Sequence, residues 1–231
     1  MEGRPISELL DDRPWGVGQA VGAVLAGLAA AVAASLAVGP EITDAETFRV
    51  IIPSQALVQV ALIWGWASQS ARRRLSLGWR FEGSDLVGIP IGVGFQIAAS
   101  LALLPIDRWV LHGDTPTQDV VESASGLTGF DIALVVIGAG LLAPLAEELV
   151  FRGILLRALL VRRGPQFATY VTAGVFAGIH LLDPSAWLVV PVLFVFGVLL
   201  AKITISSGRL SRALLAHMAF NLLAVAALFL A

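Results

Sequence analysis

Two adjacent carboxylates inside an uncharged apolar run are the residues of this sequence best suited to chemistry. Glu147 and Glu148 follow the stretch 141–146, which reads LLAPLA. A carboxylate in the hydrocarbon part of a membrane costs about 2.5–3.5 kcal/mol on insertion scales, so a functional site is the default interpretation. Neighbouring residues on a helix point roughly 100° apart, and the two carboxylates therefore need different partners.

Arg152 is the nearest candidate partner for one of these carboxylates. It lies four residues after Glu148, on the same face of a helix, where an ion pair can form. Such a pair would satisfy Glu148 and leave Glu147 for another task. The alternative is that both glutamates lie at the cytoplasmic interface, beside the first of several basic residues, without a chemical role.

Histidine supplies the second kind of reactive group. His180 follows Phe176 by four residues, and Gly174 and Gly178 would let another backbone approach this helix closely. The alternative is a packing residue, which is the commoner role of a lone histidine on a helix. His112 lies in a polar stretch, where a solvated side chain is expected.

A third pair lies near the carboxyl end. His217 and Asn221 are four residues apart, so both project from one helix face toward the same partner. The same pair could equally serve as a contact between helices, worth about 0.6 kcal/mol in a bilayer.

Taken together, these motifs indicate one polar pocket. They contain nearly all the polar residues of the last apolar segments, namely Glu147, Glu148, Arg152, His180, His217 and Asn221. Glutamate and histidine can act as general base and acid, while asparagine and a second histidine can donate hydrogen bonds to a developing oxyanion. The set therefore suits hydrolysis by an activated water, and the chain has neither a serine in a nucleophile elbow nor any cysteine.

The elements that must position these residues are membrane-spanning helices. Hydrophobic residues make up 57% of the 231 and charged residues 14%, against about 25% charged in a soluble domain. We therefore expect an all-α, polytopic membrane helix bundle with a cytoplasmic tail at 1–14 and a single transmembrane domain at 15–231. The expected spans are 14–40, 50–71, 86–106, 130–161, 166–182, 184–201 and 210–231.

Two features within the spans predict local geometry. Gly88 and Gly92 form a small-xxx-small pattern that would let another helix approach the third span. Pro144 is expected to kink the fourth, because it lacks a backbone donor. The stretch 149–163 could instead be a separate amphipathic or half-inserted helix, so the predicted number of spans is seven to eight.

The basic residues predict the orientation. Of fifteen Lys and Arg, thirteen fall in alternate connections, and Arg49 and Arg108 alone fall in the others. Cytoplasmic loops are enriched in Lys and Arg, which puts the amino terminus in the cytoplasm and the carboxyl terminus outside. The Ala, Gly and Arg bias suggests a bacterial plasma membrane as the location of this multi-pass protein.

The three motifs, in this order on successive apolar helices, resemble the signature of a known family. Glu147-Glu148-x-x-x-Arg152, Phe176-x-x-x-His180 and His217-x-x-x-Asn221 are similar to the boxes of the CPBP family, the CAAX-protease and bacteriocin-processing (Abi) intramembrane endopeptidases. The resemblance covers about 130–225, which would be the catalytic core.

The resemblance implies a role for each residue. Glu147 and His180 would activate the attacking water, and Glu148 with Arg152 would support their helix. His217 and Asn221 would stabilise the oxyanion or complete a metal shell. The family is commonly called a metalloprotease, so Glu147, His180 and His217 could ligate zinc, yet the chain lacks the HExxH motif that joins two zinc ligands and a base. Both the metal-dependent and the metal-free mechanism remain open.

The expected function is thus an intramembrane endopeptidase acting on a membrane-associated protein or peptide. The expected partners are that substrate and the lipid bilayer, and nucleic acid is not expected. One alternative is a proton-coupled transporter, although no duplicated half is visible. Another is a non-catalytic membrane scaffold. We also expect the site to line a water-filled cavity that opens toward the cytoplasm.

Overall fold

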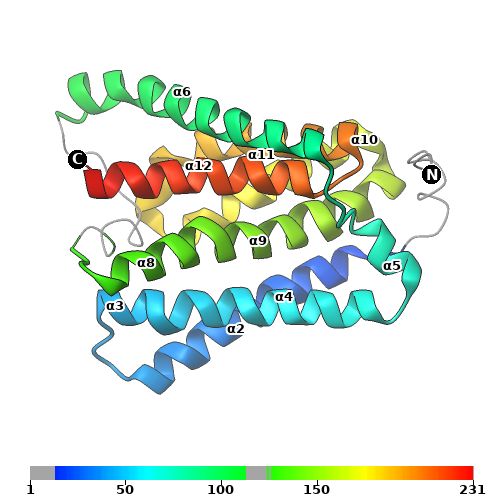
Figure 1. Cartoon of the computed structure of the whole chain (residues 1–231), viewed down its shortest axis with the longest axis horizontal. Coiled ribbons are helices and arrows are strands. Elements are labelled where there is room, and N and C mark those ends of the chain that lie inside the picture. The colour runs from blue at the N-terminus through cyan, green and yellow to red at the C-terminus, as the bar shows by residue number, and fades with distance from the viewer. Residues whose placement is uncertain (1–13, 113–123, 125, 231) are drawn as a thin grey trace.

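The fold is an all-α bundle whose long helices run along the longest axis of the molecule (Figure 1). It is seen in a computed structural model, which describes residues 14–112, 124 and 126–230. The predicted cytoplasmic tail lies outside these residues, apart from Pro14.

The first half of the chain contributes three long helices with short helical segments between them. These elements are α2 (Val17–Val38), α3 (Asp44–Glu46), η1 (Thr47–Ile51), α4 (Ile52–Ser68), α5 (Ala71–Ser76), η2 (Gly83–Val87) and α6 (Gly88–Trp109). The second half is helical from Phe130 onward. Its elements are α8 (Phe130–Ile137), η3 (Gly138–Leu142), α9 (Ala143–Glu148), η4 (Leu149–Leu155), α10 (Leu156–Ile179), η5 (His180–Leu182), η6 (Pro184–Leu188), α11 (Val190–Ser207) and α12 (Ser211–Leu230).

The structure has six candidate spans among the residues that it describes, against the seven to eight expected. Six helical stretches of the described chain are long and apolar enough to cross a membrane, and the one at Phe130–Leu182 has 53 residues. Gly164 divides that stretch, because its φ of 80° and ψ of 172° are not helical. Its two arms counted separately make seven spans. The alternative of a separate amphipathic helix at 149–163 is wrong, since α9, η4 and α10 are continuous and every residue of 149–156 is buried.

The boundary between the fifth and sixth spans differs from the prediction. The sixth begins at Val190 instead of 184, because Pro184–Leu188 forms a 3₁₀ turn. The Asp183 side chain caps that turn by accepting a hydrogen bond from the Ser185 backbone N–H at 2.9 Å. The α-helix of the fifth span ends at Ile179, and the 3₁₀ turn η5 carries the chain to Leu182, where this span was expected to end.

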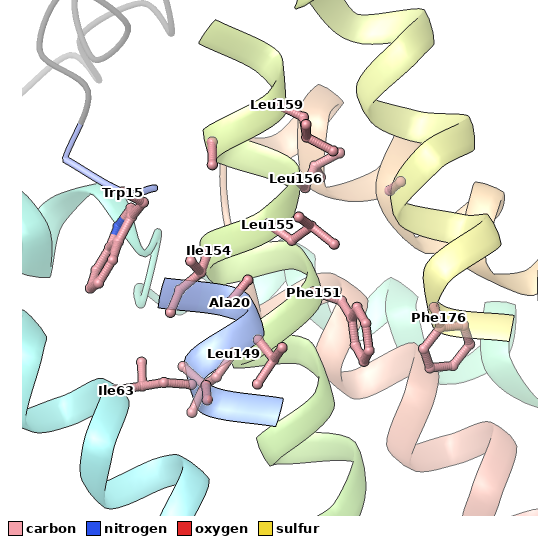
Figure 2. Packing of buried hydrophobic residues seen from close by; sticks show 14 of the residues in the cluster. Trp15, Ala20, Ile63, Leu149, Phe151, Ile154, Leu155, Leu156, Leu159 and Phe176 are labelled. Carbon is pink, nitrogen blue, oxygen red and sulfur yellow. The ribbon is translucent and has the colours of Figure 1, made fainter. Parts of the chain in front are cut away.

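The core surrounds η4, the segment that follows the two glutamates. Leu149 and Ile154 point toward α2 and α4, where they meet Ala20 and Ile63 (Figure 2). Phe151 points the other way and packs against the ring of Phe176, with ring centroids 5.4 Å apart. The glutamate-bearing helix is thus enclosed by the other elements.

Close helix contacts occur at glycines, though not at all those expected. A Cβ at Gly92 would lie 3.0 Å from the backbone N of Phe220, so the predicted approach of another helix, α12, is confirmed. The prediction for Gly174 and Gly178 is wrong, because no other described helix comes nearer than 4.0 Å to a Cβ built at either. The tight contact to α10 comes instead from α11, where a Cβ at Gly197 would lie 3.1 Å from the Ala173 Cα.

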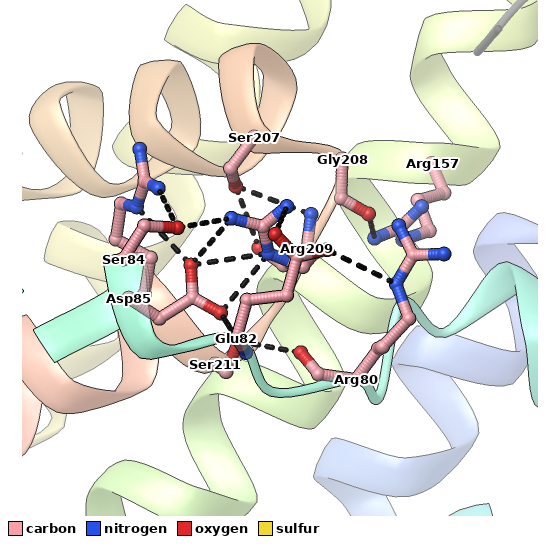
Figure 3. Close-up of polar contacts among 10 residues, drawn as sticks. Arg80, Glu82, Ser84, Asp85, Arg157, Ser207, Gly208, Arg209 and Ser211 are labelled. Atoms are coloured by element: carbon pink, nitrogen blue, oxygen red, sulfur yellow. Dashed lines mark hydrogen bonds and ion pairs between the residues drawn. The ribbon is translucent and has the colours of Figure 1, made fainter. Parts of the chain in front are cut away.

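A polar cluster joins the basic connections at one end of the bundle (Figure 3). The sequence places Asp85 in a polar connection, yet it is fully buried at the start of the third span. Its carboxylate accepts hydrogen bonds from Arg209, at 2.8 Å to Nη2, and from the Ser211 hydroxyl at 2.6 Å. The bond to Asp85 raises the pKa of Arg209, which therefore stays charged. The Leu210 N–H also donates to the Gly78 carbonyl, so two of the predicted inner connections meet.

Candidate active site

Two π-helices bracket the glutamates. η3 ends just before Pro144, and η4 begins directly after Glu148. Pro144 keeps the chain helical, and the irregularity is a change of hydrogen bonding from α to π in the residues ahead of it. π-helical segments leave backbone groups unpaired and occur frequently at functional sites. The helix is therefore most irregular around its two charged residues.

Glu148 forms the predicted pair with Arg152. Both side chains are fully buried, and Arg152 Nη1 lies 2.7 Å from Glu148 Oε1. Arg152 Nη2 also donates to the Gly197 carbonyl at 3.4 Å, and its guanidinium lies 4.5 Å from the centre of the Phe176 ring. The spacing of four residues therefore produces an internal ion pair that ties this helix to α11 and α10.

His217 bridges the two glutamates, a contact that the sequence did not predict. Its Nδ1 lies 2.9 Å from Glu148 Oε1, and its Nε2 lies 3.5 Å from Glu147 Oε2. A carboxylate only accepts, so Nδ1–H is the donor to Glu148. This bond fixes the ring and directs Nε2 toward Glu147, so α12 supplies an imidazole to the carboxylates of α9.

Glu147 and His180 line the same cavity. The cavity holds about 470 Å³, and α2 and α4 form its other wall. Glu147 keeps 29% of its side chain exposed, in contrast to its fully buried neighbour Glu148. His180 Nδ1 lies 2.8 Å from the Phe176 carbonyl, which can only accept, so this bond leaves the other ring nitrogen of a neutral imidazole without a proton. The cavity thus contains a carboxylate and a basic nitrogen on separate helices.

The Phe176 ring packs against both site histidines. Its centroid lies 5.2 Å from that of His180 and 5.7 Å from that of His217, each in an edge arrangement. The ring also lies under Arg152, as described above. The aromatic residue of the second motif therefore positions members of all three motifs.

Neither His217 nor Asn221 lines the cavity, and Asn221 contacts η3 instead. Its Nδ2 donates to the Ala139 carbonyl at 2.8 Å, within η3. Asn221 and His217 are absent from the cavity lining, although His217 reaches Glu147 from behind. The expectation that all four residues line one cavity is thus met by Glu147 and His180, and in the described chain Asn221 instead supports a π-helical carbonyl.

The cavity extends from Glu147 toward one end of the bundle. Its lining includes Thr47 and Asp183, which lie at the end of the bundle opposite the Arg-rich connections. The cavity runs from there to Glu147 near the middle. On the other side of Glu147, Phe151, Leu155 and their neighbours belong to the buried core. The expectation that the cavity opens toward the cytoplasm stays a prediction.

The residues named as zinc ligands do not form a complete ligand set. Glu147 and His217 approach each other, but within the described residues no group of three or more His, Asp or Glu side chains is arranged to hold an ion. Structural and catalytic zinc sites need at least three such protein ligands. The arrangement in hand instead provides a carboxylate, two imidazoles and a compensating arginine.

Two glutamines line the cavity and were not predicted from the sequence. Gln55 and Gln59 of α4 line the wall that also includes Val24 and Leu28 of α2. Their spacing of four residues in an apolar span was visible. However, a glutamine on its own does not reveal which other helix it faces.

Comparison with known proteins supports the resemblance. Residues 129–223 match the family model described as type II CAAX prenyl endopeptidase Rce1-like. The match contains all three motifs and ends two residues after Asn221. No curated protein and no solved structure matched the chain.

Proposed function

We propose that the chain is an intramembrane endopeptidase of the CAAX-protease type, which hydrolyses peptide bonds with a Glu/His-activated water; the match of residues 129–223 to that family model supports the proposal. The observation that carries the proposal is that Glu147 and His180, from different helices, line one cavity within the membrane-spanning bundle. The family match supports the class of reaction, and the shared cavity supports the assignment of Glu147 and His180 to the attacking water.

The proposed first step is the activation of water. Glu147 accepts a proton from a water held between its carboxylate and the unprotonated nitrogen of His180, and the oxygen attacks the carbonyl carbon of the scissile bond. Glu147 then delivers that proton to the amine that leaves. A carboxylate can serve as this base because its neighbour Glu148 is neutralised by Arg152 and does not compete for the same water.

His217 has the second role. His217 donates Nδ1–H to Glu148 and places Nε2 at 3.5 Å from Glu147 Oε2, so it orients the carboxylate that accepts the proton from water. No step of this mechanism passes through a metal, because the described residues do not provide a three-ligand group.

The test is proteolysis by purified protein of a set of membrane-associated peptides. Glu147→Gln keeps the shape and removes the base, so the rate should fall by roughly 10²–10⁴-fold without loss of folding. Glu41→Gln is the matched control, because it makes the same change at an exposed carboxylate and should leave the rate unchanged. Equal rates for Glu147→Gln and wild type would contradict the mechanism. Proton flux into vesicles without any cleavage would favour a transporter.

A further inference from the structure

We propose that Gln59, together with Gln55 one turn earlier, binds the main chain of the peptide substrate on the cavity wall that faces Glu147. This inference rests on the proposed function, since it assigns the substrate-binding wall of the same site. The three motifs and the family match all lie after residue 128, so neither of them assigns a role to α4.

Gln59 is a buried amide without a visible partner. Its residue is 6% exposed, and among the residues that the structure describes no hydrogen bond is made by its side chain. It lies in the stretch Asp44–Ser68, which is apolar enough to cross a membrane. Its amide atoms are not among the fully enclosed polar atoms without a partner, and Gln59 lines the cavity. The amide can therefore exchange its hydrogen bonds with water for hydrogen bonds with a ligand that enters the cavity.

The neighbouring helix makes room for this amide. A Cβ at Gly27 of α2 would lie 2.7 Å from Gln59 Cγ and 2.6 Å from its Cδ. Any side chain at position 27 would thus displace the glutamine from its place on the cavity wall. Gly27 and Gln59 are thus complementary in size. Because position 27 has no side chain, the polar side chain of Gln59 fits against α2 at the cavity wall.

The chemistry of the wall matches a peptide backbone. A glutamine amide has an acceptor oxygen and two N–H donors, and it can pair with both the C=O and the N–H of a peptide unit. Gln55 and Gln59 are four residues apart, about 6 Å along the helix axis. Peptide units that face the same side of an extended chain recur at about 6.6–6.8 Å. The two amides can therefore contact alternate peptide units of one extended strand.

The rest of the lining suits the substrate's side chains. The remaining lining is largely apolar, and its apolar residues make no hydrogen bonds that would restrict the substrate's side chains. They include Val24, Leu28, Ile52, Val150 and Phe151. A helical substrate could not use the glutamines, because its N–H and C=O groups are already paired within the helix. We therefore expect the site to bind an extended, apolar segment of the substrate. Contacts to the main chain of that segment should contribute more to selection than contacts to any single side chain.

The experiment is a backbone scan of a cleaved peptide. Single N-methyl groups or ester bonds are placed at successive positions around the scissile bond, and kcat/KM is measured for wild type and Gln59→Met. One lost hydrogen bond lowers the wild-type value by about 10-fold at a particular position. In Gln59→Met the unmodified peptide should lose about 10-fold, and the modification at that position should cost nothing more.

Two further variants keep the test decisive. Gln96→Met removes an amide from α6 that already bonds Ser100 within its own helix, and it should retain the wild-type scan. Gly27→Ala displaces Gln59 without removing it, and it should weaken the penalty at the same position. An unchanged scan in Gln59→Met, or the same change in Gln96→Met, would overturn the assignment. If Gln59→Met does not fold, the Gly27→Ala scan decides alone.

Failure of the proposed function can be told apart from failure of this inference. If wild type cleaves the peptide and the scan does not depend on Gln59, the endopeptidase stands and the substrate wall lies elsewhere. If wild type cleaves nothing, the affinities of wild type and Gln59→Met for the same fluorescent peptides are compared by anisotropy. If Gln59→Met binds the unmodified peptide more weakly than wild type does, and a backbone modification removes that difference, the assignment of Gln59 to substrate binding is supported. Equal affinities of the two proteins overturn it.

Discussion

Asp85 and Glu148 are both fully buried carboxylates paired with arginine, yet their surroundings differ in how many polar atoms find partners. Both oxygens of Asp85 accept hydrogen bonds, from Arg209, Arg212, Ser211 and the backbone of Glu82 (Figure 3). Glu148 uses one oxygen for both of its partners. In the part of the chain that the structure describes, its Oε2 and the Nε of Arg152 are buried without a partner.

This difference distinguishes a fully hydrogen-bonded cluster from the one at the proposed active site. The Asp85 cluster is saturated, so it has nothing to offer a ligand, and it fixes the start of α6 against the start of α12. The Glu148 cluster retains unused hydrogen-bonding capacity beside an exposed carboxylate. Unsatisfied buried groups are uncommon in native proteins, and the two in this pair lie next in sequence or in space to Glu147, which supports the proposed site.

The largest effect should come from breaking the saturated cluster. Asp85→Asn leaves Arg209 and Arg212 without their buried counterion, and we expect a loss of about 3–5 kcal/mol in unfolding free energy. Thermal unfolding in detergent measures the loss. Asp131→Asn is the control, since its partner Arg49 is 51% exposed and such pairs contribute about 1 kcal/mol or less. A Tm equal to that of the control would contradict the comparison, as would a fall in kcat per folded molecule.

The Glu148–Arg152 pair should show strong coupling. Glu148→Gln and Arg152→Gln each leave one buried charge unpaired, so the double variant should be little less stable than either single one. The coupling free energy in the double-mutant cycle should reach about 1–3 kcal/mol. Unfolding of all four proteins in one detergent gives the value. Additive losses would show that the two charges are stabilised independently.

Asn221→Ala tests whether Asn221 belongs to the proposed active site or supports the fold beside it. Because Asn221 donates to the Ala139 carbonyl, its loss should cost about 1 kcal/mol of stability and less than tenfold in kcat. The resemblance implies instead an oxyanion donor, whose removal lowers kcat by about 10²–10³-fold. Parallel measurement of Tm and kcat distinguishes the two roles, since a large kcat loss at unchanged Tm would support the donor.

The smallest effect is expected from metal removal. The described residues offer no three-ligand group, so dialysis against a chelator should leave the cleavage rate within about twofold. A loss of activity that added zinc restores would contradict this expectation. It would also show that Glu147, His180 and His217 close around an ion in another conformation.

Contacts within one helix were predictable from the sequence. The spacing of Glu148 and Arg152 specified their pair because residues four apart on a helix are neighbours. The Gly88 and Gly92 pattern likewise predicted a close helix contact. The class of fold followed from composition, because only helices satisfy the backbone over long apolar segments of this kind.

Contacts between helices were not predictable in the same way. His217 bonds both glutamates, and Gln59 faces Gly27, through packing between segments far apart in the chain. The π-helix that gives Asn221 its partner has no clear signal in sequence. The burial of Asp85 depends on Arg209 folding back from 124 residues away. The orientation of the chain across the membrane, drawn from its basic residues, stays a prediction.

The Phe176 ring, which lies against both imidazoles, also offers a spectroscopic probe of the site. A fluorine atom on this ring would sense the electric field of His180 and of His217 at once, since both lie within 6 Å of its centre. Protonation of either imidazole changes that field, and the resonance would shift with it. A single label, placed on a residue that takes no part in the reaction, could thus follow the protons of the site in the membrane.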